Sequence, residues 1–100
     1  MVLAVLGLNH KTVSVDIREK FSISEESARE GLLHLSEQEG IEEAVVLSTC
    51  NRTEIYAVLK DEGDKEELYH FFLTLSGNSK AEKEYFFFYT GTECIRHLFR

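Results

Sequence analysis

The chain has 100 residues, 43% of them hydrophobic, which is enough for one compact domain with a single core and too few for two. A charged fraction of 29% and an aromatic content of 11% exclude a disordered chain. The formal net charge of −7 excludes a free-standing domain that captures nucleic acid by neutralising phosphates. A nucleic acid held mainly by other domains stays compatible with this charge.

The first apolar segment, residues 2–8, is predicted to be a strand buried on both faces. It is too short to span a bilayer and has no basic stretch before it, so we expect no membrane partner. The two cysteines, Cys50 and Cys94, are far apart and in no paired spacing, which indicates a reducing compartment. Together these features predict a cytoplasmic protein.

Two helices are predicted after this strand. The first covers residues 14–21. The S-x-x-E spacing of residues 22–25 has the pattern of a capping box, in which side chains satisfy the first free N–H groups of a helix. The second helix is expected to run to about Glu39 and to end at Gly40.

Residues 44–47 and 55–59 are predicted to be two antiparallel strands, because only a short polar stretch separates them. Asp64 and Glu67 are expected to cap a further helix that Gly77 ends. Its apolar stripe has helical spacing and consists of Leu68, Phe71, Phe72 and Leu75. Residues 85–89 are predicted to be a fourth strand.

The chain closes on a helix that begins at Thr92. The order β-α-β-β-α-β predicts an α+β fold of the ferredoxin-like kind, an antiparallel four-stranded sheet with helices on one face. Arg100 falls inside the last helix, which indicates a piece of a longer protein, the alternative being a natural end with a frayed tail. Ile95, Leu98 and Phe99 should form an exposed apolar stripe that is prone to weak self-association.

The run of residues 48–54, Ser-Thr-Cys-Asn-Arg-Thr-Glu, carries the strongest chemical signal. Cys50 follows a buried strand, and Arg52 lies two residues further on. A fixed cation favours the thiolate, which is the form that attacks a carbonyl carbon. The same guanidinium is alternatively suited to hold a substrate carboxylate. Thr49 and Asn51 offer donors for a carbonyl or its oxyanion.

Other interpretations of these residues stay open at this point. A free cysteine is often a small buried hydrophobe, and the Asn-Arg-Thr segment is compatible with a plain hairpin turn. Cys94 and His97 lie three residues apart on one predicted helix, but no other pair has zinc-like spacing, so we expect no metal. His97 is either a partly buried histidine or a proton donor or acceptor near Cys50.

Taken together, three segments resemble glutamyl-tRNA reductase. They are residues 7–12 with Arg18 and Glu19, the more specific residues 44–56, and residues 97–100. The family often has a proline where this chain reads Lys-Thr-Val-Ser-Val at residues 11–15, and its loss changes local stiffness.

The resemblance implies that residues 1–100 are the N-terminal part of the catalytic, glutamyl-recognition domain. The family is an oxidoreductase of tetrapyrrole (porphyrin) biosynthesis that reduces glutamyl-tRNA(Glu) with NADPH to glutamate-1-semialdehyde through a cysteine thioester. It further implies Cys50 and His97 as catalytic residues, and Thr49, Asn51 and Arg52 as substrate-binding residues.

Several parts that the family needs are not expected within these residues. There is no G-x-G-x-x-G after a strand, so the resemblance places the NADPH site elsewhere, together with the segment that forms a homodimer. The fragment alone is therefore not expected to reduce substrate. The alternative function is a small ferredoxin-like binding or regulatory module with a structural cysteine. An RNA-recognition module on the same fold is disfavoured by the acidic charge.

Overall fold

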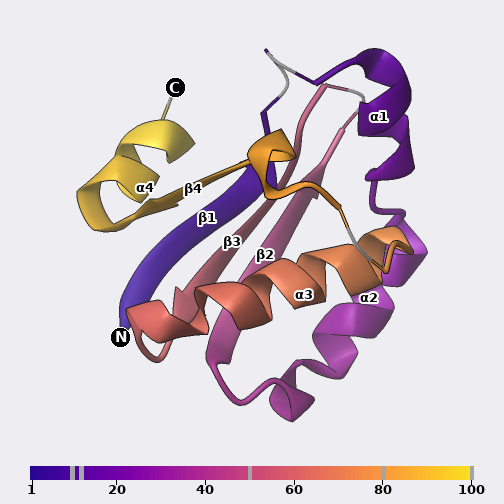
Figure 1. Ribbon diagram of the computed structural model, residues 1–100. Coiled ribbons are helices and arrows are strands. Elements are labelled where there is room, and N and C mark those ends of the chain that lie inside the picture. Colours follow the sequence, from indigo (N-terminus) through magenta and orange to yellow (C-terminus); the bar gives the residue numbers. More distant parts are fainter. Residues whose placement is uncertain (10, 12, 50, 80, 100) are drawn as a thin grey trace.

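The computed structural model describes residues 1–9, 11, 13–49, 51–79 and 81–99. Within these residues the fold contains one antiparallel four-stranded sheet in the order β2-β3-β1-β4 (Figure 1). The strands are β1 (Val2–Leu8), β2 (Ile41–Ser48), β3 (Thr53–Leu59) and β4 (Phe86–Thr90). Helical crossovers join β1 to β2 and β3 to β4. This is the ferredoxin-like arrangement, so the predicted fold class is confirmed.

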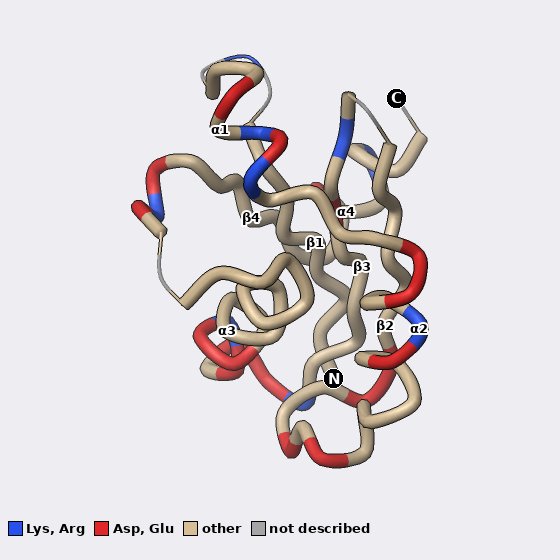
Figure 2. Tube along the Cα trace, turned by 90° about the vertical axis from the view of Figure 1, so that its right-hand side faces the viewer, with Lys and Arg blue, Asp and Glu red and all other residues tan. Residues whose placement is uncertain are grey.

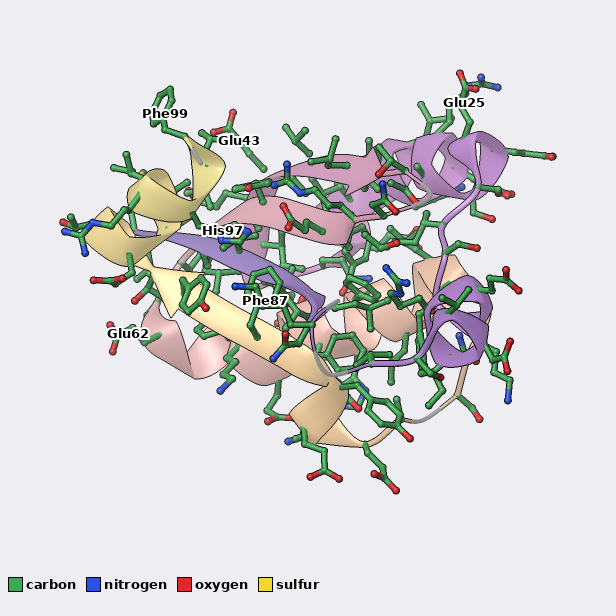
Figure 3. The ribbon with its side chains drawn as sticks, turned by 90° about the horizontal axis from the view of Figure 1, so that it is seen from above. Glu25, Glu43, Glu62, Phe87, His97 and Phe99 are labelled. Atoms are coloured by element: carbon green, nitrogen blue, oxygen red, sulfur yellow. The ribbon has the colours of Figure 1, made fainter. Side chains whose placement is uncertain are left out.

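The helices cover the two faces of the sheet unequally. They are α1 (Val15–Lys20), α2 (Glu25–Leu33), α3 (Lys65–Ser76) and α4 (Gly91–Leu98), with short 3-10 turns η1 (Leu35–Glu37), η2 (Glu62–Asp64) and η3 (Lys83–Tyr85). α2 and α3 lie side by side on one face, as expected for the two crossovers. Figure 3 shows α4 on the opposite face, above β1 and β4.

The main core lies between the sheet and α3. Every second residue of β1 and β3 points toward this helix, as the period of a strand requires. The buried side chains that meet there are Ala4, Leu6, Leu8, Ile55, Ala57, Leu59, Leu68, Phe71, Phe72 and Leu75. The stripe predicted on α3 is therefore confirmed. Burial of each large apolar side chain stabilises the fold by about 1.5–3 kcal/mol.

The predicted capping box before α2 is wrong. The N-cap is Ser24, whose hydroxyl accepts the N–H of Ser27 at 3.0 Å. The residues before it are held extended because the N–H of Ile23 donates to Ser48 Oγ at 3.2 Å and the Ile23 side chain is buried. The helix therefore begins after residue 24, and the first serine of the predicted box does not cap it.

The predicted end of this helix at Gly40 is also wrong. α2 ends at Leu33, and the chain tightens into η1. Gly40 instead lets the loop approach α3, because a Cβ atom there would lie 2.5 Å from Asp64 Cγ. Its N–H donates to both carboxylate oxygens of Glu67 at 3.1 Å, so Glu67 binds the loop.

The start of the α3 segment also differs in detail from the prediction. Asp61 and Asp64 form a capping box around η2, which leads directly into α3. Acidic residues occupy the first turns of α2 and α3 (red in Figure 2), where negative charge complements the helix dipole. Gly77 ends α3 with a left-handed φ of 79°, as predicted.

The last helix exposes the stripe that the sequence predicted. Ile95, Leu98 and Phe99 are 46%, 50% and 81% exposed, and Figure 3 shows Phe99 pointing away from the sheet. Self-association through this stripe stays a prediction. The inner side of α4 instead carries Cys94, which is 1% exposed, and His97.

Gly7 makes room on the sheet face that α4 covers. It lies opposite Glu54 on β3 and Phe87 on β4. A Cβ atom at this position would lie 2.6 Å from Phe87 Cζ and 2.8 Å from Glu54 Cγ. Both neighbours are held by other contacts, so an added methyl group would force one of them to move.

We therefore expect Gly7→Ala to destabilise the domain by about 1–3 kcal/mol, because overpacking outweighs the entropic gain of alanine. For a domain of this size the melting temperature should fall by roughly 4–8 °C per kcal/mol. The control is Leu3→Ala, on the same strand and face but 37% exposed. Thermal unfolding in which Gly7→Ala melts at or above the unmodified chain would contradict this packing.

Candidate functional site

The turn between β2 and β3 holds three of the described residues predicted for the site, Thr49, Asn51 and Arg52. Thr49 Oγ1 accepts the backbone N–H groups of Asn51 at 3.2 Å and Arg52 at 3.1 Å. The Thr49 N–H donates to the Arg52 carbonyl at 2.7 Å. Thr49 therefore shapes the turn and fixes where the Arg52 side chain leaves it. Cys50 lies outside the described residues, and its role as nucleophile stays a prediction.

The Arg52 guanidinium binds a buried carboxylate. Its Nη2 donates to Glu54 Oε1 at 2.7 Å and its Nε to Glu54 Oε2 at 3.2 Å. The Glu54 side chain is 2% exposed, whereas that of Arg52 is 37% exposed. This two-point geometry is the strong form of an arginine–carboxylate pair. Arg52 and Glu54 share a face because they stand two residues apart on an extended chain.

Two further donors complete the surroundings of Glu54. The Tyr56 hydroxyl donates to Oε1 at 3.0 Å, and His97 Nε2 lies 3.0 Å from Oε2. Each carboxylate oxygen thus has two partners, which satisfies an ionised carboxylate. We call Arg52, Glu54, Tyr56 and His97 the Glu54 network. It joins the β2–β3 turn to α4, and it brings together two of the predicted site residues, Arg52 and His97.

His97 is held by aromatic rings as well as by Glu54. Its ring centroid lies 4.7 Å from that of Phe87 and 5.4 Å from that of Tyr89, and Figure 3 shows His97 beside Phe87 above the sheet. The carboxylate of Glu54 only accepts hydrogen bonds when ionised, so the hydrogen-bond pattern assigns the ring proton to Nε2. The other nitrogen, Nδ1, is buried and has no partner among the described residues.

The electrostatics of the network follow from these contacts. Burial by itself would raise the pKa of Glu54, but the hydrogen bonds from Arg52, His97 and Tyr56 and the charge of Arg52 together lower this pKa below its ordinary value. The hydrogen bond to Glu54 raises the pKa of Arg52. Burial and the bond to the Glu54 carboxylate raise the pKa of Tyr56 to about 12. The Arg52–Glu54 pair is therefore one cation and one anion at neutral pH.

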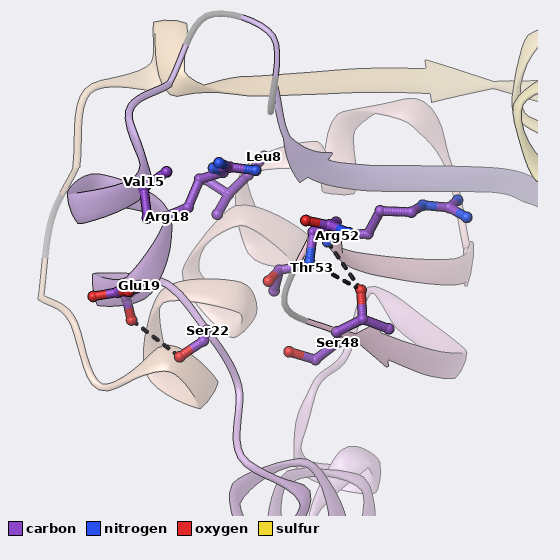
Figure 4. A pocket seen from close by; sticks show the side chains of 10 residues that line it. Leu8, Val15, Arg18, Glu19, Ser22, Ser48, Arg52 and Thr53 are labelled. Atoms are coloured by element: carbon purple, nitrogen blue, oxygen red, sulfur yellow. Dashed lines mark hydrogen bonds between the residues drawn. The ribbon is translucent and has the colours of Figure 1, made fainter.

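A cavity of about 570 Å³ opens on the other side of the same turn (Figure 4). Its lining comes from β1, α1, β2, the turn and β3, and consists of Leu8, Val15, Arg18, Glu19, Ser22, Ser48, Thr49, Asn51, Arg52 and Thr53. Figure 4 shows the Arg18 side chain reaching from α1 toward Leu8, while the guanidinium of Arg52 points away. The Arg18 Nε is buried and has no partner among the described residues.

Glu54, Tyr56 and Arg18 were not predicted as site residues. The alternation of Arg52, Glu54 and Tyr56 along a strand is a signal that would have placed all three on one face. Nothing in the local sequence indicates that α4 reaches this face and buries the carboxylate.

The described residues contain no group of three or more His, Cys, Asp or Glu side chains that could hold a metal ion. Cys94 is buried, and its burial raises the pKa of its thiol, which disfavours the thiolate that a metal needs. No helix within the described part of the chain is long and apolar enough to cross a membrane.

The buried carboxylate predicts a specific pH dependence of stability. Because the folded pKa of Glu54 lies below the ordinary value of 4.5, its contribution is present above that pH and is lost as the pH falls through the folded pKa. Glu54→Gln should cost about 1.5–3 kcal/mol at neutral pH, because it removes hydrogen bonds to a charged group. The difference from the unmodified chain should shrink in acid, as measured by urea unfolding.

The control for this experiment is Glu66→Gln, which removes an exposed partner of Lys83 and should leave the curve nearly unchanged. A constant difference between Glu54→Gln and the unmodified chain down to strongly acidic pH would contradict the assigned charge of Glu54.

The comparisons with known proteins agree over the length of the chain. The family described as glutamyl-tRNA(Glu) reductase, N-terminal domain, matches residues 6–100. The glutamyl-tRNA reductase of Desulforudis audaxviator is 44% identical over 101 residues, covering 100% of this chain and 23% of that protein. That of Synechocystis sp. is 44% identical over 102 residues, covering 100% of this chain and 24% of that protein.

A solved structure, that of glutamyl-tRNA reductase from Methanopyrus kandleri, is similar with a TM-score of 0.68 and 28% sequence identity. The match covers 98% of this chain and 21% of that one. The chain therefore spans about a quarter of the length of the relatives that it matches.

Proposed function

Because the chain belongs to the glutamyl-tRNA reductase N-terminal domain family, we propose that it forms the N-terminal part of the catalytic domain of such an enzyme. The proposed enzyme reduces glutamyl-tRNA(Glu) with NADPH to glutamate-1-semialdehyde in tetrapyrrole biosynthesis. The observation that carries the proposal is the family match over residues 6–100, which includes the turn with Cys50 and the Glu54 network.

In this proposal the chemical role of the chain is acyl transfer. The thiolate of Cys50 attacks the ester carbonyl that joins glutamate to the terminal ribose of the tRNA. A carbon–sulfur bond forms and the ester carbon–oxygen bond breaks. The ribose oxygen takes up a proton from water, which replaces the one lost by the thiol, and the tRNA leaves with a free hydroxyl group. The Arg52 cation, two residues further along the chain, favours the thiolate. The product on this chain is a glutamyl thioester.

Arg52 is also the proposed anchor of the glutamate carboxylate. A guanidinium has five N–H donors, and Glu54 uses the Nε–H and one hydrogen of Nη2. The edge formed by Nη1 and Nη2 keeps donors that have no partner among the described residues, and the side chain is 37% exposed. This edge is suited to a second carboxylate in two-point geometry. Thr49 and Asn51 complete the proposed pocket beside Cys50.

Reduction and assembly are assigned to the rest of the proposed enzyme. Residues 1–100 do not fit a dinucleotide, because no glycine-rich loop follows a strand. We therefore place the NADPH site, the homodimer contact and most tRNA contacts outside these residues, and we propose a cytoplasmic location.

The central test is capture of the acyl group on the full-length protein. With glutamyl-tRNA labelled in glutamate and no NADPH, we expect acid-stable label on the protein that hydroxylamine releases, as for a thioester. Cys50→Ser should reduce the label to background. The control Cys94→Ala should keep it, because Cys94 is 1% exposed and unavailable to substrate.

Alkylation kinetics distinguish the alternative of a binding or regulatory module with a structural cysteine. A reactive Cys50 should alkylate with an apparent pKa below the free-thiol value of about 8.5. A thiol that reacts only on unfolding, together with no labelling in the Cys50 experiment, would refute the proposed function.

The role of Arg52 predicts a change of selectivity. Arg52→Met should lower the ratio of kcat/KM for glutamyl over glutaminyl ester by about 10–100-fold, the size expected for a charge-assisted contact. Arg18→Met is the matched control, since Arg18 is a second arginine that lines the same cavity but lies on α1. If Arg18→Met lowers the ratio and Arg52→Met does not, the carboxylate anchor is Arg18.

A further inference from the structure

Glu54 has no free capacity to bind substrate. Its two oxygens accept from Arg52 Nη2 and Tyr56, and from Arg52 Nε and His97, and the side chain is 2% exposed. If a substrate displaced one of these partners, the buried charge of the carboxylate would lose a hydrogen bond that compensates it, which is unfavourable. Glu54 can therefore affect a reaction only through a residue that it contacts.

The residue through which Glu54 can act is Arg52. Arg52 and His97 both contact the Glu54 carboxylate, and the side chain of Arg52 is the more exposed of the two, at 37% against 16%. An arginine side chain has several rotatable bonds, and Glu54 fixes the plane of its guanidinium through two hydrogen bonds. The orientation of the Nη1–Nη2 edge of Arg52 thus depends on the orientation of Glu54.

His97 is arranged to fix Glu54 and not to exchange protons with a substrate. Its Nε2 is committed to Glu54 Oε2 at 3.0 Å. Its Nδ1 is buried without a partner among the described residues, and Phe87 and Tyr89 lie against the ring. Neither nitrogen is open to a reacting group, whereas a general acid or base must be within hydrogen-bond reach of one.

We propose that Glu54 is a positioning residue for Arg52, and that His97 supports the reaction through Glu54. In this arrangement His97 and Tyr56 hold the carboxylate from α4 and from β3, and the carboxylate holds the guanidinium that receives the glutamate side chain. The inference rests on the proposed function, because the reaction itself is assigned there.

The test compares His97→Gln with His97→Leu in the full-length enzyme. The amide of glutamine can still donate to Glu54 but does not titrate, whereas leucine cannot donate. We expect His97→Gln to recover most of the selectivity that His97→Leu loses and to keep both limbs of the pH profile. His97→Leu and Glu54→Gln should each lose about 10–100-fold in the glutamyl over glutaminyl selectivity that Arg52 supplies.

A double-mutant cycle measures whether the effects of His97 and Glu54 on selectivity are coupled. If His97 acts through Glu54, the double variant with Glu54→Gln and His97→Leu should be no less selective than Glu54→Gln alone. Tyr56→Phe is the second variant in case His97→Leu fails to fold. It removes one donor to Glu54 without touching His97 and should lower the same selectivity ratio.

The inference is overturned if folded His97→Gln is as inactive as His97→Leu, if it loses a limb of the pH profile, or if the two losses in the cycle add. These outcomes differ from failure of the proposed function, which is absence of label on Cys50 in the unmodified enzyme.

Discussion

The site depends on how the fold stabilises one buried negative charge. Moving a carboxylate out of water costs several kcal/mol, and the attraction of a single cation does not always offset this cost. In this chain Glu54 has a bidentate arginine and two further partners, Tyr56 and His97, so both oxygens are fully used. The requirement for these partners fixes the positions of the turn, of β3 and of α4 relative to one another.

The sheet supplies this arrangement through its two faces. Alternate residues of β3 pack into the main core, and those between them, Glu54 and Tyr56, point toward α4. The neighbouring strand contributes Gly7, which leaves the space that the side chains of Glu54 and Phe87 occupy. The ferredoxin-like fold needs only the two crossover helices on one face of the sheet. The additional helix α4 covers the opposite face, and its residue His97 completes the surroundings of Glu54 there.

The sequence predicted the parts of this structure that depend on local patterns. The order of elements, the stripe on α3 and the end of α3 at Gly77 follow from periodicity and from residue conformation. The limits of α2 did not, because a long-range bond from Ile23 to Ser48 sets its start. Gly40 likewise serves a contact with Asp64 and Glu67, which lie far along the chain, so its role is invisible to local reasoning.

The candidate site was predictable to the same extent. The turn and Arg52 were found because they are contiguous, and His97 entered through the resemblance to a family. The bond between His97 and Glu54 spans 43 positions, so no spacing rule indicates it. From the sequence alone, the assignment of Arg52 as thiol activator or carboxylate anchor rests on chemistry, because its pairing with Glu54 and the support of Glu54 by His97 are not visible there.

The net charge of the chain bears on the proposed roles of Arg18 and Arg52. With a formal charge of −7, the domain repels a polyanion such as tRNA at long range, so capture must come from other parts of the proposed enzyme. Near the turn the local balance differs. Arg18 and Arg52 both line the cavity, and the Arg52 side chain is 37% exposed. An acidic domain with two arginines beside one cavity is suited to discriminate the small acyl group that reaches it, because an interaction at contact distance survives the screening that removes long-range repulsion.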